Sequence, residues 1–225
     1  DTWVARGTEV SPYYDPMIAK IIVHGSDRRD AILRMRQALD QTRIAGIASN
    51  LDYLRSILAA DFFLEGEVST SRLADFQWQP PVIEVLQPGT SSSVQDYPGR
   101  TGYWSIGVPP SGPMDDYAFR LANRIVGNHA SAAALEFTLI GPTLRFHCDA
   151  LIALTGAPSD ALLDGQPVAF WTPVAVTAGQ VLEVGRAEQG CRSYLAVRNG
   201  LDVPLYLGSR STFALGQFGG HAGRT

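Results

Sequence analysis

One glycine- and proline-rich block between positions 90 and 115 concentrates the side chains best suited to hold a small polar molecule. Its polar members are Gln95, Asp96, Arg100, Ser111 and Asp115. Glycines permit positive φ and close approach by a ligand, and a loop that fixes several polar groups suits recognition of such a molecule. The block is therefore our first candidate for a substrate site.

The same residues also have a structural interpretation. Asp96 and Arg100 are spaced to form an ion pair within a turn. Asp115 lies in the first turn of a predicted helix, where the helix dipole favours a carboxylate. Both interpretations stay open for each single residue, whereas the block as a whole favours binding.

A second polar group lies toward the end of the sequence. Arg210 with its serine neighbours Ser209 and Ser211 could bind an anion such as a carboxylate. His221 follows two glycines and is the histidine of most interest for proton transfer, although a single histidine is more often a structural group. The four histidines and two cysteines lack the spacing of metal ligands, and no G-x-S-x-G motif occurs. We therefore predict no metal site and no hydrolase triad.

Length and composition predict a soluble globular protein of one large or two small domains. The 225 residues are 45% hydrophobic and 18% charged, which disfavours disorder. A net charge of −4 gives no support to nucleic-acid or anionic-membrane binding. Cys148 and Cys191 are isolated and are expected to be reduced. No apolar run approaches a membrane span, so a cytoplasmic location is the default.

The first 75 residues predict a small α+β piece. The mostly apolar run Met17–Val23 is typical of a half-buried strand. A helix is expected over positions 28–42, because apolar residues recur there at three-to-four spacing, and Gly46 breaks that pattern. Ser26 or Asp27 is expected to cap this helix, and Asn50 is expected to cap the next one.

The sequence changes character after a linker at positions 76–81, which contains two adjacent prolines. Short apolar runs separated by Gly, Pro and Asp are typical of a β-barrel or sandwich. The Asp164-Gly165 pair predicts a hairpin turn, and one amphipathic helix is expected over Met114–Val126. The predicted strands are Val82–Leu86, Leu144–Phe146, Leu151–Leu154, Val168–Trp171, Val181–Val184 and Ser193–Val197.

The N-terminal motifs form an ordered set. They are the run Ser-Pro-Tyr-Tyr-Asp-Pro-Met-Ile-Ala-Lys at 11–20, then Gly25, Arg28, Ala31-Ile32 and the run Ala-Gly-Ile-Ala-Ser-Asn at 45–50. This set resembles the C-terminal tail of biotin carboxylases. The resemblance implies that the catalytic arginine and the ATP-binding core lie upstream, that Tyr13 and Tyr14 are packing residues, and that Arg28 lies where the family pairs subunits. No Met-Lys-Met biotin-attachment motif is present.

A second ordered set follows the linker. It consists of Thr90–Arg100, Gly107–Asp115, Ala153–Ala157, Tyr206–Phe213 and Phe218–Arg224. This set resembles the start of the KipA-like domain, also called allophanate hydrolase subunit 2. The resemblance implies three parts: positions 1–75 as a partial biotin carboxylase subdomain, 76–81 as linker, and 82–225 as a truncated KipA-like carboxyltransferase domain. The implied fold class is α+β, with a mainly-β, incomplete cyclophilin-like barrel and one prominent helix.

Both sets in this order are typical of the urea carboxylases of the urea amidolyase family. The resemblance implies conversion of urea and bicarbonate to allophanate with biotin and Mg-ATP, neither bound by this fragment, which alone should be inactive. The implied partners are urea, a carboxybiotin carrier domain and a KipI-like domain, with no nucleic acid, no membrane, and a homodimer through the carboxylase half. Polarity and loop context, rather than the resemblance, give the candidate site residues: Asp96, Asp115 and His221 as catalytic, and Gln95, Arg100, Ser111, Asn123 and Arg210 for substrate binding.

Two alternatives remain open. Guanidine carboxylases share this architecture, and composition cannot separate a carbonyl acceptor from an iminium acceptor. A KipA-like module without biotin would instead be one of the subunits of 5-oxoprolinase or an antagonist of a kinase inhibitor. The carboxylase-like tail at positions 1–75 argues against the latter, because a free-standing KipA-like protein would start near Val82.

Overall fold

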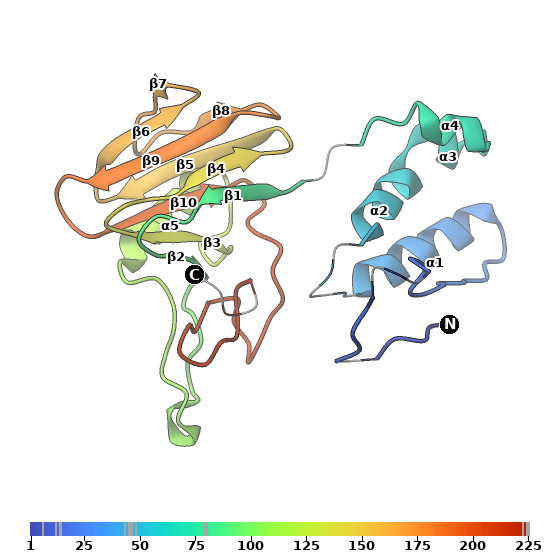
Figure 1. The fold of residues 1–225 in the computed structure, drawn as a ribbon, viewed down its shortest axis with the longest axis horizontal. Helices are drawn as coiled ribbons and strands as arrows, with labels where there is room; N and C mark the ends of the chain where they lie inside the picture. Colours follow the sequence, from blue (N-terminus) through green and yellow to red (C-terminus); the bar gives the residue numbers. More distant parts are fainter. Residues whose placement is uncertain are drawn as a thin grey trace. The chain divides into compact units, whose positions relative to one another are not determined.

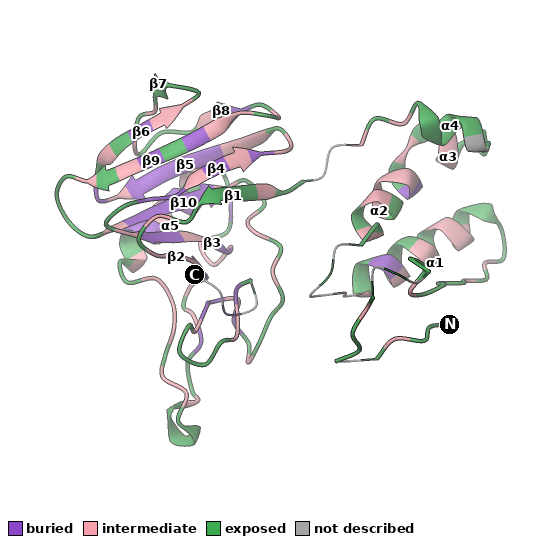
Figure 2. Ribbon diagram, viewed as in Figure 1, coloured by how far each residue is buried: buried purple, intermediate pink, exposed green. Residues whose placement is uncertain are grey.

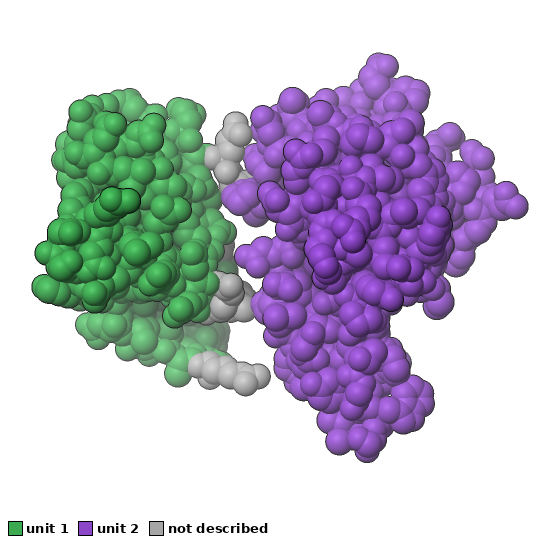
Figure 3. Space-filling view, turned by 180° about the vertical axis from the view of Figure 1, so that it is seen from behind, with its two compact units in different colours: residues 1–80 green, residues 81–225 purple. Residues whose placement is uncertain are grey.

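The chain divides into two compact units, Asp1–Pro80 and Pro81–Thr225, coloured separately in Figure 3. The computed structural model describes residues 1–5, 7–11, 13, 15–42, 44, 47, 49–78, 81–221 and 223, and of residue 70 only the backbone. Several residues named above lie outside these ranges: Pro12, Tyr14, Ala45, Gly46, Ala48, Pro80, Ala222, Arg224 and Thr225.

The first unit is helical (Figure 1). Its helices are α1 (Arg28–Gln41), α2 (Leu51–Ala59), α3 (Asp61–Leu64) and α4 (Thr70–Ala74). The predicted helix over 28–42 is confirmed, and Asp27 caps it by accepting a hydrogen bond from the backbone N of Asp30 at 2.8 Å. Asn50 precedes α2 as predicted but makes no side-chain capping bond.

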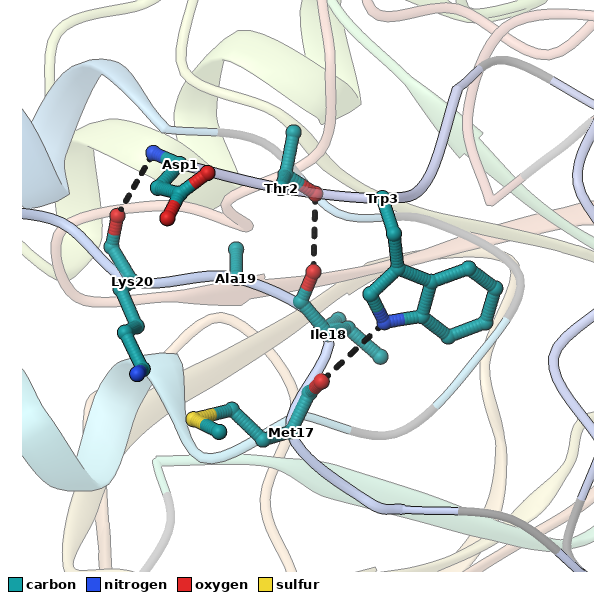
Figure 4. A pocket seen from close by; sticks show the side chains of 7 residues that line it. All are labelled: Asp1, Thr2, Trp3, Met17, Ile18, Ala19 and Lys20. Atoms are coloured by element: carbon teal, nitrogen blue, oxygen red, sulfur yellow. Dashed lines mark hydrogen bonds between the residues drawn. The ribbon is translucent and has the colours of Figure 1, made fainter.

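The strand predicted over Met17–Val23 does not form. Among the residues described in this unit, only an isolated bridge pairs Thr2 with Ala19, supported by backbone bonds between Asp1 and Lys20. A strand needs a ladder of backbone partners, and Ile22, with 82% of its surface exposed, lies outside any core. Figure 4 shows this pairing around a cavity of about 210 Å³, where the Trp3 indole N–H donates to the Met17 carbonyl.

The second unit consists of two open antiparallel sheets. One has the strand order β1-β4-β9-β6-β7 and the other β2-β3-β10-β5-β8. The strands are β1 (Ile83–Gln87), β2 (Ser92–Gln95), β3 (Ala134–Thr138), β4 (Thr143–Phe146), β5 (Ala150–Gly156), β6 (Ser159–Leu163), β7 (Gln166–Pro167), β8 (Val174–Val176), β9 (Val181–Ala187) and β10 (Arg192–Val197). The α+β class with a mainly-β second domain is confirmed; the described strands close into no barrel.

Strands β5 and β10 of the second sheet are buried along most of their length (Figure 2). Alternate residues of β5 and β10, such as Leu154 and Leu195, join the core between the two sheets. Their neighbours Ala153, Tyr194 and Ala196 pack instead against helix α5 (Asp116–Ile125). Since side chains of a strand alternate between faces, this double burial explains why β5 and β10 are almost continuously apolar.

Most predicted strands are confirmed, but no strand covers Val168–Trp171. Val168 donates to the Ala161 carbonyl in one sheet, and Trp171 donates to the Leu154 carbonyl in the other. Trp171 also has a positive φ of 63°. The segment therefore crosses from sheet to sheet, which a continuous strand could not do.

The predicted hairpin turn at Asp164-Gly165 is confirmed between β6 and β7. Both residues have positive φ, 47° and 77°, as a tight turn of this kind requires. The Cβ of an alanine at Gly165 would meet nothing within 4 Å, so only the backbone conformation opposes it. We expect Gly165→Ala to lower the free energy of unfolding by about 1–2 kcal/mol in guanidinium chloride titrations. Gly165→Asn should lower the free energy of unfolding by less, because asparagine tolerates a positive φ. Equal losses in the two variants would show that the backbone conformation is not the cause.

An exposed charged cluster ties the first strand of the second unit to β4. Glu84 on β1 accepts from His147 at 2.9 Å and from Arg145 at 3.2 Å. The hydrogen bond from His147, followed by the charge of Arg145, lowers the pKa of Glu84 below its ordinary 4.5.

This lowered pKa predicts the direction of a pH effect. A carboxyl whose pKa falls on folding stabilises the fold above its ordinary pKa, and that contribution disappears as the pH falls through the lower folded value. Glu84→Gln should therefore have a slightly lower Tm than the unaltered chain at pH 7, and the difference should shrink as the pH falls below the ordinary pKa of a glutamate. A difference that grows on acidification would refute this assignment.

Candidate functional site

The polar block predicted between positions 90 and 115 forms the connection from β2 to α5, which extends away from the sheets in Figure 1. At its base Asp96 is buried and bonds to a second segment more than 110 residues later. Its Oδ1 accepts from Ser209 Oγ at 2.5 Å and Ser211 Oγ at 2.7 Å, and its Oδ2 accepts from Arg210 N at 2.7 Å. Both carboxylate oxygens are thus occupied within the protein.

Arg100 is the other buried charge at this base, with 1% of its surface exposed. Its guanidinium donates to the carbonyls of Tyr206 and Ser211 and to Ser111 Oγ, at 3.1, 2.8 and 2.9 Å. It also lies 4.9 Å from the centroid of the Phe218 ring. Burial lowers the pKa of Arg100, while the charge of Asp96 acts in the opposite direction.

The ion pair expected between Asp96 and Arg100 does not form. Both side chains instead turn to residues 206–211, and together they join that segment to the β2–α5 connection. We call this set, Asp96, Arg100, Ser111, Tyr206, Ser209 and Ser211, the loop clamp.

Two glycines let the segments of the loop clamp approach this closely. A Cβ at Gly99 would lie 1.7 Å from the Ser111 carbonyl oxygen, and one at Gly219 would lie 2.7 Å from Arg100 Nη2. Both glycines also have positive φ. Glycine is therefore required at these positions by contact as well as by conformation.

Gln95 lies at the end of β2 with 6% of its surface exposed. Its Nε2 donates to Ser93 Oγ at 2.9 Å, and its Oε1 is buried without a hydrogen-bond partner. A buried unpaired acceptor is uncommon in native proteins, so Gln95 remains a candidate for binding a donor group.

Asp115 is the N-cap of α5 rather than a residue of its first turn. Its Oδ1 accepts from the Ala118 backbone N at 3.0 Å, and its side chain is exposed. No hydrogen bond to its Oδ2 occurs among the described residues. Of the two predicted carboxylates, only Asp115 keeps an oxygen available to a ligand.

Two buried residues that the sequence did not suggest support Asp115 from the sheet. Tyr194 OH accepts from the Asp115 backbone N at 2.7 Å and donates to Glu136 Oε2 at 2.9 Å. The same Glu136 oxygen accepts from Met114 N at 2.7 Å. A lone glutamate within the apolar run that forms β3 was the signal available in the sequence.

Of the remaining predicted site residues, Arg210 joins this group only through its backbone N, which donates to Asp96. Asn123 is fully buried on α5, where its side chain bonds to Ala132 and Asn128. Arg210 donates its Nε to the Val203 carbonyl at 3.0 Å, and His221 is exposed. The structure therefore brings together Asp96, Arg100, Ser111 and the backbone of Arg210, but it does not place Asn123 in the loop clamp.

Two observations on the described residues concern the cofactors implied by the resemblance. No group of three or more His, Cys, Asp and Glu side chains able to hold a metal ion occurs among them. Lys20 is the single lysine of the sequence, and it lies in an Ile-Ala-Lys-Ile context unlike a biotin-attachment site. Of the helices described, none combines the length and apolar character that crossing a membrane would take.

Two family models match the sequence. Residues 106–225 match the carboxyltransferase domain, subdomain A and B, and residues 1–75 match the biotin carboxylase C-terminal domain.

Individual relatives extend this result. The chain is 55% identical over its whole length to a urea amidolyase of Saccharomyces cerevisiae, of which it covers 12%. The crystal structure of the Kluyveromyces lactis urea carboxylase matches all of it, with a TM-score of 0.87 and 55% identity, and the chain covers 20% of that protein. One of the 5-oxoprolinase subunits of Escherichia coli is 42% identical over 143 residues, which are 64% of this chain and 46% of that protein.

Proposed function

We propose, from the premise that this chain belongs to the family of the carboxyltransferase domain, subdomain A and B, that it is part of a biotin-dependent urea carboxylase. In this proposal residues 1–75 close the biotin carboxylase region, 76–81 are a linker, and 82–225 begin the carboxyltransferase region. The observation that carries it is the order of two family matches on one chain, because a carboxyltransferase domain of another enzyme would not need a biotin carboxylase tail.

The proposed reaction requires that the carboxyl acceptor, urea, is bound in a fixed orientation and loses a proton. Carboxybiotin would supply carbon dioxide beside the acceptor. A urea nitrogen attacks its carbon, the N–C bond forms as one C=O π bond breaks to give the carboxylate oxygen, and the nitrogen loses a proton to a base. Because urea nitrogen is a poor nucleophile, orientation and proton removal are the main tasks. Asp115 is our candidate for the base, since its Oδ2 is available, and Gln95 Oε1 is a candidate acceptor for an N–H group.

The other predicted residues take different parts in this proposal. Asp96, Arg100 and Ser111 act through the loop clamp, which fixes the loop rather than the acceptor. Arg210 is a candidate to stabilise the developing carboxylate, and His221 is a candidate for proton transfer. Asn123 is buried on α5, so it could affect substrate binding only by fixing the position of that helix.

Cofactors and partners belong to the larger protein. Biotin supplies the activated carboxyl group and is attached outside this chain, and Mg-ATP, which drives formation of that group, binds in the carboxylase region before it. A biotin carrier domain and a KipI-like domain are the proposed protein partners, with a homodimer through the carboxylase half and a cytoplasmic location. Exposed apolar side chains on the β2–α5 connection, Trp104 and Ile106 at 72% and 69%, support a protein contact there.

Two alternatives keep specific support. Guanidine in place of urea would meet the same acceptors, Asp115 and Gln95, with more N–H donors. A module without biotin is supported by the similarity to the 5-oxoprolinase component over 143 residues. It would bind a KipI-like partner and show no biotin-linked turnover.

The test is ADP release by the complete enzyme with bicarbonate, with urea or guanidine added, with and without avidin. Urea stimulation that avidin abolishes is expected. Stronger stimulation by guanidine would change the acceptor. The absence of any acceptor-dependent, avidin-sensitive turnover from soluble biotinylated enzyme would favour the module without biotin.

A further inference from the structure

A buried carboxylate and a buried phenol lie under the N-terminus of α5. Glu136 on β3 has 6% of its surface exposed, and Tyr194 on β10 has none. They are direct partners in the sheet register, so both side chains leave the sheet on the face that α5 covers. Burying an ionisable group is costly unless its hydrogen bonds are satisfied. Packing alone therefore does not explain why Glu136 and Tyr194 are buried at this position.

The hydrogen bonds of the pair run in one direction. Tyr194 donates its single proton to Glu136 Oε2, which leaves a lone pair of the phenol oxygen for the Asp115 backbone N. Burial, with the charge of Glu136, raises the pKa of Tyr194, so the phenol stays protonated. Glu136 Oε2 also accepts from Met114 N, and Arg192 Nη1 lies 3.6 Å from its Oε1. The carboxylate thus fixes the orientation of the phenol.

The backbone groups held in this way belong to the residues that begin α5. Asp115 is exposed and caps α5 through Oδ1, with Oδ2 available. Its carboxylate is oriented by two anchors, the capping bond on one side and the Tyr194 hydroxyl on the other. A backbone shift of about 1 Å can cost on the order of a hundredfold in rate, so the second anchor would matter for catalysis.

We propose that Glu136 and Tyr194 are positioning residues that hold the Asp115 carboxylate in place for the acceptor. This inference rests on the proposed function, because it assigns a purpose to Asp115 in that reaction. Neither residue touches the acceptor; both act through the backbone of Met114 and Asp115.

The test is a double-mutant cycle in the complete enzyme, with Tyr194→Phe and Asp115→Asn made singly and together. Tyr194→Phe should lower kcat with the acceptor by about 10- to 100-fold, with little change in KM. In the Asp115→Asn background it should cause no further loss, because the group that it orients is already inactive. Losses that multiply would overturn the inference.

Two controls separate positioning from general damage. Tyr117→Phe makes the same chemical change on α5 itself, at a residue with 64% of its surface exposed, and should leave kcat unchanged. Glu136→Gln keeps an acceptor for Tyr194 and Met114 and should lose less activity than Glu136→Leu. If Tyr194→Phe fails to fold, kcat of Glu136→Gln and Glu136→Leu, each with and without Asp115→Asn, tests the positioning role instead.

A structural readout keeps the inference separate from the proposed function. Hydrogen exchange at the amides of Met114 and Asp115 should accelerate in Tyr194→Phe while exchange in β10 stays slow. Unchanged exchange together with unchanged kcat would overturn the positioning role alone. An unaltered enzyme without acceptor-dependent, avidin-sensitive turnover would overturn the proposed function, and the catalytic part of this inference with it.

Discussion

Asp115→Asn is expected to lower the acceptor-dependent turnover of the complete enzyme by about 10²- to 10⁴-fold. The substitution removes the charge and basicity of the one predicted carboxylate whose Oδ2 is available, and it keeps the shape of the side chain. Asparagine is as good an N-cap as aspartate, so the bond that caps α5 at Ala118 should survive. Activity should therefore fall while the Tm stays unchanged.

The measurement compares kcat with urea and the bicarbonate-dependent ATP cleavage that occurs without acceptor. Only the first should respond, because residues 1–75 and whatever precedes them in the complete enzyme are unaltered. Asp116→Asn is the matched control: this neighbour pairs with Arg120 on the exposed side of α5. An Asp115→Asn enzyme with full acceptor-dependent turnover would remove this residue from the chemistry.

Local patterns in the sequence predicted the helices α1, α2 and α5 and the turn at Asp164-Gly165, but not the short helices α3 and α4. Helix α1 has a capping aspartate and apolar residues at helical spacing, and the Asp164-Gly165 turn depends on two adjacent residues. Such features are decided by neighbours in the chain, so a sequence pattern contains them. The helix α5 was predicted for the same reason, with its start misplaced by two residues.

The elements that escaped prediction depend on distant partners. Strand β2 has the sequence Ser-Ser-Val-Gln, which lacks an apolar alternation, and it forms because its backbone pairs with β3. The segment Val168–Trp171 is apolar like a strand, yet its backbone bonds go to two different sheets.

The candidate site shows the same division. The polar block was located from its composition, but the spacing of Asp96 and Arg100 indicated an ion pair that is absent. Apart from Ser111, their partners lie 106 to 115 positions away in sequence, beyond the reach of any local pattern. Glu136 and Tyr194 were missed because each lies in a strand whose other residues belong to the core.

The loop clamp provides the largest expected effect on stability. Asp96→Asn should lower the free energy of unfolding by about 3 kcal/mol, because an amide group would replace an acceptor that faces three donors in a buried site. Arg100→Met should cost a similar amount, about 2–4 kcal/mol, since it removes three hydrogen bonds made by a buried guanidinium, to the carbonyls of Tyr206 and Ser211 and to Ser111 Oγ. Hydrogen exchange should accelerate first at residues 92–100 and 206–220.

The double variant distinguishes a coupled pair of charges from two independent contacts. Although the two side chains form no direct ion pair, the charge of Asp96 acts on Arg100. Each single variant leaves one buried charge without this opposite charge nearby, whereas Asp96→Asn with Arg100→Met removes both, so the double loss should be smaller than the sum of the two. Asp116→Asn with Arg120→Met makes the same changes in an exposed pair 2.9 Å apart and should cost less than about 1 kcal/mol. Additive losses at Asp96 and Arg100 would mean that their hydrogen bonds, and not their opposite charges, hold the two segments together.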